Sequence, residues 1–395
     1  MDFEETSEHQ MLREAVSSIA AKYGHAYFVD QARSGGKVAE LWGELAKAGY
    51  IGVGIPEQWG GGGMGIYELS IVCEELAAQG TPILLLVVSP AVNATLIERF
   101  GTDDQRSRWL PRFADGSMKM AFAITEPDAG SNSHNISTAA TKDGDVYRLN
   151  GTKYYISGCD EAEAVLVVAR TGADEQTGRG KLSLFVVDLD APGVTYTPIP
   201  VEMTAPEKQF TVFFDNVEVP ASRLLGAEHE GLREVFFGLN PERIMTSAIG
   251  VGIGRYALSR ASEYARNRSV WGMPIGSHQA VSHPLAKAKI ELEQAKLMLQ
   301  KAAWAYDREK NGADGSRGSG VDTGEAANMA KYAGAEAAIT CLDAAIQTHG
   351  GNGMASEYGL ATLMGNARLL RTAPVSREMI LNFVAQHSLD LPKGY

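Results

Sequence analysis

A β-rich stretch at residues 118–219, between two long helical regions, is the feature that most limits how this chain can fold. Runs of β-branched and aromatic residues recur within it, at 120–124, 146–149, 153–157, 164–168, 182–187, 194–198 and 210–219. The dipeptides Asp143-Gly144 and Asn150-Gly151 are typical of two-residue hairpin turns. The stretch therefore predicts a compact antiparallel β-barrel or sandwich.

Helical periodicity flanks this stretch on both sides. Apolar residues repeat at helix spacing from Leu12 to Ala20, and further helices are predicted at 42–48, 67–77, 103–113, 325–348 and 376–387. One face of another long helix is marked by Leu285, Ala288, Leu292, Ala295, Leu299, Ala302 and Tyr306. A polar, Gly- and Ser-rich connection follows it at 311–323.

These segments predict an α+β multidomain protein. We expect an N-terminal helical domain at 1–116, a middle β-domain at 117–228 and a C-terminal four-helix bundle at 229–395. A chain of 395 residues is too long for one simple core, which also favours two or three domains.

Charge and cysteine content indicate which binding partners and which cellular compartment to expect. The net charge of −12 argues against nucleic acid or an anionic membrane as a partner, because both attract basic surfaces. The cysteines Cys73, Cys159 and Cys341 lie far apart and form no disulfide framework or metal-ligand spacing, which favours a reducing cytoplasm. The N-terminus is not typical of a signal peptide, and no apolar run has the length of a membrane span. We therefore expect a cytoplasmic protein.

Several motifs occur in a definite order along the chain: PEQWGGGG (56–63), TEPDAGS (125–131), NGTKYYISG (150–158), FDNVEVP (214–220), RNRSVWGMPIGSHQ (266–279) and QTHGGNG (347–353). Each alone is a weak signal; TEPDAGS by itself is better explained as a turn capped by Asp128 and Ser131. Together, and over nearly the whole chain, they resemble the acyl-CoA dehydrogenase family. The resemblance implies FAD as cofactor, an acyl-CoA thioester as substrate, an electron-transfer flavoprotein as electron acceptor, and a homotetramer built as a dimer of dimers.

A first group of implied FAD contacts lies in the middle domain: Phe122, Thr125, Gly130, Ser131, Tyr155 and Ser157. By resemblance, the residues from 122 to 131 line the isoalloxazine ring or the thioester end of the substrate. Tyr155 and Ser157 are two residues apart on a predicted strand and so share a face, where the ring can cover a flavin and the hydroxyl can bond its polar edge. The alternative is an ordinary half-buried strand pair.

A second group lies in the C-terminal region and is implied to bind the FAD of a neighbouring subunit: Arg268, Trp271, Gln279, Gln347, Gly350 and Gly351. Arg268 offers a planar fork for a pyrophosphate, and Trp271 offers a stacking surface. Without the resemblance, these two residues are explained as a surface arginine and a core tryptophan. Ser376 completes the expected cofactor contacts.

Family members carry the catalytic base at one of two positions, and this sequence has a carboxylate at only one of them. Acyl-CoA dehydrogenation needs a carboxylate at the α-proton of the substrate. Many family members carry this glutamate late in the chain, where this sequence has Pro374. The isovaleryl-CoA and long-chain branch carries it in a segment similar to LNPERI (239–244), which places the base at Glu242, with Asn240 and Arg243 shaping the substrate pocket. The alternative for Glu242 is a helix-start carboxylate beside Pro241.

The expected reaction is α,β-dehydrogenation to a trans-2-enoyl-CoA, with the α-proton leaving to Glu242 and a β-hydride leaving to flavin N5. Pro374 leaves a second interpretation open, in which the chain is a weakly active or non-catalytic partner subunit of a hetero-oligomer. A third is a flavin oxidase or monooxygenase on the same fold. Many relatives have an R-x-S-D-T run where this chain has VEMTAPEKQFTVFF (201–214). The sequence therefore does not predict the CoA contacts that this run implies.

Overall fold

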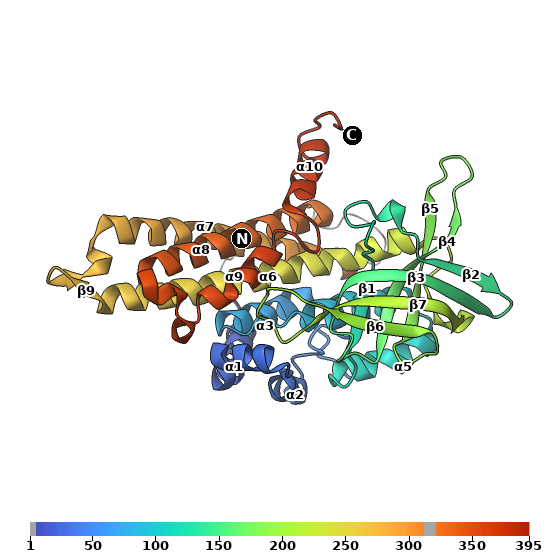
Figure 1. The fold of residues 1–395 in the computed structure, drawn as a ribbon, viewed down its shortest axis with the longest axis horizontal. Coiled ribbons are helices and arrows are strands. Elements are labelled where there is room, and N and C mark those ends of the chain that lie inside the picture. Colours follow the sequence, from blue (N-terminus) through green and yellow to red (C-terminus); the bar gives the residue numbers. More distant parts are fainter. Residues whose placement is uncertain (1–4, 312–320, 395) are drawn as a thin grey trace.

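The computed structural model describes residues 5–311 and 321–394. Figure 1 shows an elongated molecule, with the middle β-sheet at one end and long C-terminal helices running away from it. The N-terminal helices pack along one side of these long helices and under the sheet. A single large hydrophobic cluster joins the N-terminal helices, one side of the sheet and the long helices.

The N-terminal region is helical, as predicted. Its helices are α1 (Ser7–Ser34), α2 (Ala39–Lys47), α3 (Ile66–Ala78), α4 (Thr95–Phe100) and α5 (Asp103–Ala114). Leu12, Val16 and Ala20 are buried on α1, which confirms the apolar repeat. The α5 helix begins with a capping box, in which Thr102 Oγ1 accepts from the Gln105 amide and Gln105 Oε1 accepts from the Thr102 amide. A buried π-helical segment, η2 (Val87–Ala94), was not expected from the sequence.

The middle region forms an eight-stranded sheet in the order β6-β7-β3-β2-β4-β5-β8, with β1 paired to β4. The strands are β1 (Met120–Ala123), β2 (Ala139–Asp143), β3 (Val146–Ser157), β4 (Ala164–Ala173), β5 (Gly180–Asp188), β6 (Val194–Ile199), β7 (Gln209–Pro220) and β8 (Leu224–Leu225). The predicted antiparallel barrel or sandwich is wrong, because β1 and β2 both pair with β4 in parallel and the sheet stays open, with β6 and β8 at its edges. A mixed sheet of this kind needs long crossover connections, which the local turn signals do not reveal.

One of the two predicted hairpin turns is also wrong. Asp143-Gly144 does connect β2 to β3, but Asn150-Gly151 lies inside β3, where the pairing with β7 shifts register. Gly151 has a φ of 150°, and a Cβ there would lie 2.6 Å from the Cα of Thr138. The Asn150 side chain accepts a hydrogen bond from the Asn216 amide across the strand pair. The dipeptide therefore makes a bulge instead of a turn.

The strand β4 is buried on both faces because it lies in the middle of the sheet. Leu166 and Val168 point towards the helices, whereas Val165 and Val167 belong to a second cluster enclosed by the sheet itself. This explains why residues 164–169 form a continuous apolar run instead of an alternating one. The carboxyl-side ends of β1 and β3 carry the predicted flavin contacts.

The C-terminal region contains three long helices within the described residues, α6 (Gly231–Asn267), α7 (Gln279–Asn311) and α8 (Thr323–His349). A small hairpin of β9 (Ser269–Val270) and β10 (Met273–Pro274) joins α6 to α7. Two shorter helices follow, α9 (Met364–Leu369) and α10 (Arg377–His387). The predicted apolar face of α7 is confirmed from Ala288 onwards: Ala288, Leu292, Ala295, Leu299, Ala302 and Tyr306 are buried, whereas Leu285 is half-buried.

Within the described residues of one chain, α10 does not complete a four-helix bundle with the three long helices. The α10 helix projects away from the three long helices (Figure 1), and only Ile380 of α10 is buried. The predicted polar connection at 311–323 falls mainly on residues 312–320, outside the described residues. Short 3-10 turns complete the chain at η1 (Glu57–Trp59), η3 (Ser133–Asn135), η4 (Ala221–Arg223), η5 (Ile275–Ser277), η6 (Gly350–Met354), η7 (Ser356–Tyr358) and η8 (Ala361–Leu363).

Candidate active site

Glu242 lies inside α6, which begins at Gly231, so it is not a helix-start carboxylate. Pro241 is also inside the helix and leaves the Phe237 carbonyl without its helical donor. The Glu242 side chain is half-buried, and its Oε2 atom is buried with no hydrogen-bond partner among the described residues. An unpaired buried carboxylate oxygen is costly, and such groups are concentrated at functional sites.

The surroundings of Glu242 set its protonation. Burial raises the pKa of Glu242 to about 7, although the positive charges of Arg243 and Lys331 oppose the shift. Arg243 is itself buried; its Nη1 donates to Asn240 Oδ1 at 2.9 Å, and its Nε has no partner among the described residues. Glu242 is therefore a carboxyl group that changes charge near neutral pH, which suits a general base.

Lys331 links the segment that contains Pro374 to the surroundings of Glu242. Lys331 on α8 is fully buried, and its ammonium donates a hydrogen bond to the Val375 carbonyl. Ser376, an expected flavin contact, is the N-cap of α10, where its hydroxyl accepts from the Met379 amide at 3.2 Å. The structure thus brings together Glu242 and Arg243 on α6, Lys331 on α8 and the segment at Pro374, which are three parts of the chain far apart in the sequence.

A buried ion pair holds the TEPDAGS loop in place. Lys153 Nζ lies 2.9 Å from Glu126 Oε1 and also donates to the Ile124 carbonyl, and both side chains are almost fully buried. Glu126 further accepts hydrogen bonds from the Ser137 amide and hydroxyl and from the Thr138 amide. The neighbouring Thr125 carbonyl accepts from the Tyr154 amide at 2.9 Å. The sequence interpretation missed this pair, although an acidic residue inside the loop and a lysine on the adjacent strand were both visible.

The first group of expected flavin contacts lies around this loop. Phe122 is buried on β1, Thr125 is half-buried, and Ser131 is exposed. A Cβ on Gly130 would meet nothing within 4 Å, so the backbone there is open to a ligand. These residues surround the loop fixed by the Glu126–Lys153 pair.

Tyr155 and Ser157 do not follow the regular alternation that was used to place them on one face. Tyr155 has a φ of 58°, and the register of β3 shifts between Lys153 and Ile156. Tyr155 is 53% exposed. Ser157 is half-buried, and its hydroxyl donates to Gln209 Oε1 at 3.0 Å. The amide nitrogen of Gln209, Nε2, is buried and has no partner among the described residues, which leaves a donor for the polar edge of a flavin.

The second group lies at the opposite end of α6, at the β9–β10 hairpin and the end of α8 (Figure 1). Trp271, in this hairpin, is 89% exposed, so a core position for it is wrong. The group is exposed to solvent: Arg268, Trp271, Gln279, Gln347, Gly350 and Gly351. Residues 242 to 267 of α6 span about 38 Å, so the second group lies far from Glu242. The structure therefore does not bring the two groups together within one chain.

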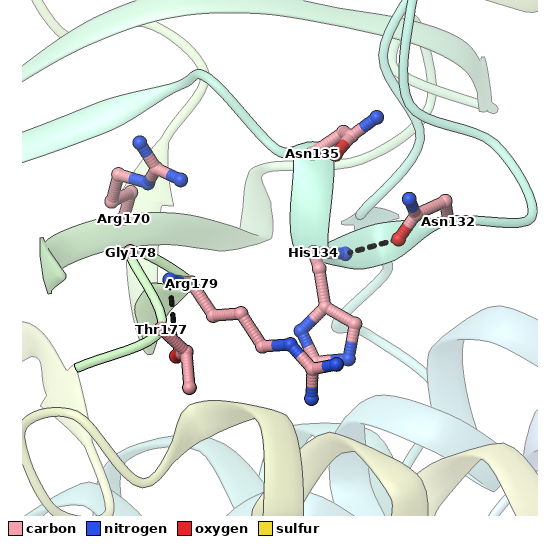
Figure 2. Close-up of a pocket in the computed structure, with 7 residues that line it drawn as sticks. All are labelled: Asn132, His134, Asn135, Arg170, Thr177, Gly178 and Arg179. Carbon is pink, nitrogen blue, oxygen red and sulfur yellow. Dashed lines mark hydrogen bonds between the residues drawn. The ribbon is translucent and has the colours of Figure 1, made fainter. Parts of the chain in front are cut away.

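A polar pocket of about 320 Å³ lies between the η3 turn and the β4–β5 hairpin. Figure 2 shows the side chains of His134 and Arg179 extending to the same side of this pocket, with Arg170 on the strand behind. Its complete lining is Asn132, His134, Asn135, Arg170, Thr177, Gly178 and Arg179. The two guanidinium groups are donors of the kind that anions favour, and the sequence interpretation did not identify this pocket.

Comparisons with known proteins agree with this architecture. Family models of the acyl-CoA dehydrogenase N-terminal, middle and C-terminal domains match residues 6–117, 121–217 and 229–389, respectively. The chain belongs to the acyl-CoA dehydrogenase family and is an enzyme of that class, as the motifs predicted. It is 56% identical over 393 residues to acyl-CoA dehydrogenase FadE12 of Mycobacterium tuberculosis, covering 100% of this chain and 99% of that protein.

Solved structures of the family have the same fold as this chain. Butyryl-CoA dehydrogenase from Megasphaera elsdenii gives a TM-score of 0.90 at 28% identity, with 98% of this chain and 100% of the other covered. The glutaryl-CoA complex of glutaryl-CoA dehydrogenase gives 0.91 at 30% identity, with 100% and 98% covered.

FAD is the cofactor of this family, as expected from the motifs. The FAD complex of PigA superposes with a TM-score of 0.90 at 26% identity, covering 99% of this chain and 100% of that one. The open backbone at Gly130 and the unpartnered Gln209 amide fit such a cofactor. Among the described residues, none of the helices combines the length and apolar character that a membrane crossing requires.

Proposed function

We propose that the chain dehydrogenates an acyl-CoA thioester to a trans-2-enoyl-CoA, with Glu242 as the base that removes the α-proton. One observation carries the assignment: Glu242 has a buried carboxylate oxygen without a partner among the described residues, and its pKa is raised to about 7, on the helix beside Arg243. FAD, when bound, supplies the hydride acceptor at N5. Thr125, Gly130 and the Ser157–Gln209 pair would hold its ring system, since they offer open backbone and free polar groups on one loop and two strands.

The thioester oxygen needs donors as negative charge develops on it. Pro374 has no amide N–H. The next amide, that of Val375, makes no hydrogen bond within the described chain, while its carbonyl is held by Lys331. We assign Val375 N–H as a donor to the thioester oxygen in place of the missing one.

The polar pocket of Figure 2 suits the phosphate groups of CoA. Arg170 and Arg179 supply the charge-assisted donors that phosphates favour, and His134 and the two asparagines supply further polar contacts. The pocket is formed by the η3 turn that follows the TEPDAGS loop, and so it lies on the same loop as the expected flavin contacts. This gives the chain a CoA contact although the R-x-S-D-T run is absent.

The division of the cofactor contacts supports an oligomer, since the exposed group at Trp271 would bind the FAD of a neighbouring subunit, and we propose the homotetramer that the family resemblance implies. Exposed apolar residues on α7, Ile290, Leu297 and Trp304, repeat every seven residues and form a stripe on one side of that helix. Such a stripe is typical of a helix that packs against another chain. Electrons would pass to an electron-transfer flavoprotein.

The test is an anaerobic titration of the purified enzyme with straight and branched acyl-CoA thioesters, followed through the oxidised flavin absorbance. Wild type is expected to be bleached by one class of thioester. Glu242→Gln is expected to retain FAD and to be bleached about 10²–10⁴-fold more slowly, the usual contribution of a general base. Glu234→Gln, at a buried glutamate bonded to the Ala227 amide on the same helix, is the matched control and is expected to react like wild type.

Bleaching of Glu242→Gln at the wild-type rate would show that Glu242 is not the base. A yellow wild type that no thioester bleaches would instead support the partner-subunit interpretation, which Pro374 favours. In that case a second chain that restores reduction of the flavin would identify the hetero-oligomer.

A further inference from the structure

Lys331 is a buried cation with an incomplete set of partners. Its side chain is 0% exposed, and the hydrogen bond to the Val375 carbonyl uses one of the three donors of the ammonium. It takes part in none of the ion pairs between described residues. A buried ammonium is costly, and an apolar side chain of similar size often stabilises a fold as well or better. A cation in this place therefore points to a role beyond packing.

The crossing of α6 and α8 fixes where this ammonium lies. Ser247 Oγ on α6 donates to the Ala330 carbonyl on α8 at 2.8 Å. A Cβ on Gly334 would lie 2.8 Å from the Cα of Ser247, so the two helices touch through their backbones. Lys331 directly follows Ala330, and Arg243 lies one turn before Ser247 on the same helix. Lys331 is thereby held beside the pair Glu242–Arg243.

We propose that Lys331 is a positioning residue for proton abstraction: it ties the Val375 carbonyl, and so the segment after Pro374, to the buried pocket of Glu242, and its charge stabilises the Glu242 carboxylate. This rests on the proposed function of Glu242. The segment needs such an anchor, because the Val375 amide must face the thioester oxygen while Pro374 offers no donor. One side chain would then position both the base and the oxygen donor.

Other charges around Lys331 come from each neighbouring helix. Arg243 on α6 repels it, whereas Glu242 on α6, Glu336 on α8 and Glu378 on α10 attract it. Glu336 is already paired with Arg371 at 2.6 Å. Burial together with Arg243 lowers the pKa of Lys331 to about 8, so the ammonium remains charged where Glu242 titrates.

The experiment measures kcat/KM against pH for holoenzyme variants with one acyl-CoA, so that titration of the substrate is common to all. In Lys331→Met, the acid limb of the profile is expected to move up by about one pH unit, since the base loses a favourable charge. On the acid side this equals about a tenfold lower kcat/KM at fixed pH. Lys331→Arg keeps the positive charge, and its acid limb is expected to lie at the wild-type position. The control Gly334→Ala disturbs the same helix crossing without changing charge, and its limb is expected to stay at the wild-type position.

Two results would overturn the proposal. One is a Lys331→Met enzyme that is less stable or loses FAD yet keeps the wild-type limb. The other is a limb that moves equally in Gly334→Ala. If Lys331→Met does not fold, Lys331→Gln keeps an amide donor for Val375 without the charge, and a wild-type limb in that variant also refutes the role. Failure of the base assignment is distinguishable, because Glu242→Gln would then turn over at the wild-type rate.

Discussion

The buried pair Glu126–Lys153 gives the most quantitative prediction. Glu126 accepts four hydrogen bonds, from Lys153, from the Ser137 amide and hydroxyl, and from the Thr138 amide. Lys153 and these hydrogen bonds outweigh burial and lower the pKa of Glu126 from 4.5 to about 2. A shift of that size corresponds to about 3 kcal/mol in favour of the ionised carboxylate. Its side chain is 3% exposed, so solvent screening is small.

Glu126→Gln is therefore expected to destabilise the enzyme by about 3 kcal/mol at neutral pH, within the range of about 3–5 kcal/mol for breaking a buried ion pair. The variant leaves the Lys153 ammonium buried without a counter-charge. Consequently the double variant Glu126→Gln/Lys153→Met is expected to be more stable than Glu126→Gln alone. Asp143→Asn removes the exposed ion pair with Arg148 from the neighbouring β2–β3 hairpin and is expected to cost below about 1 kcal/mol.

The assay is urea unfolding of the holoenzyme, followed by tryptophan and flavin fluorescence as separate probes of the chain and the cofactor. Since the folded pKa of Glu126 is depressed, its stabilisation is fully present above pH 4.5 and is lost as pH falls towards 2. The difference between wild type and Glu126→Gln must shrink over the same interval. Equal stability of Glu126→Gln and Asp143→Asn at neutral pH would refute the reasoning.

Three further predictions follow from the site. The wild-type kcat/KM is expected to rise as pH increases through about 7, because Glu242 must lose its proton to act as base; a flat steady-state profile there would contradict the assignment. Arg179→Ala is expected to raise KM for an acyl-CoA about tenfold with little change in kcat, by loss of a charge-assisted phosphate contact, and KM for an acyl-pantetheine should not change. Trp271→Ala is expected to lower the FAD content of the purified oligomer, measured by absorbance, and a full flavin complement would argue against its role.

The sequence predicted most helices because their apolar positions repeat at helix spacing. The long face from Ala288 to Tyr306 is buried as predicted, and the N-terminal helices lie where the pattern placed them. Local turn chemistry was less reliable. Asn150-Gly151 has the composition of a hairpin turn, but the approach of Thr138 and the bond from Asn216 make it a bulge within β3.

The sequence proposed individual residues of the candidate site, and those proposals stay predictions, but it did not indicate how the residues are arranged. Glu242 was singled out because Pro374 cannot serve as a base, and the alternative of a helix-start carboxylate is wrong because Glu242 lies inside α6. Nothing in the local sequence shows that Lys331 contacts Val375, or that Arg170 and Arg179 line one pocket with His134. These contacts join residues far apart in the chain. Spacing rules predict only which residues share a face within one helix or strand.

The sequence by itself therefore determined the family, the FAD cofactor and the helical framework, because ordered motifs and apolar periodicity are properties of the chain alone. The tertiary structure decided the parallel pairing of β1 with β4 and the surroundings of Glu242. The pKa of Glu242 is raised because the packed helices exclude water, and the positive charge of Lys331 on α8 opposes the rise. Both effects exist only after the chain has folded.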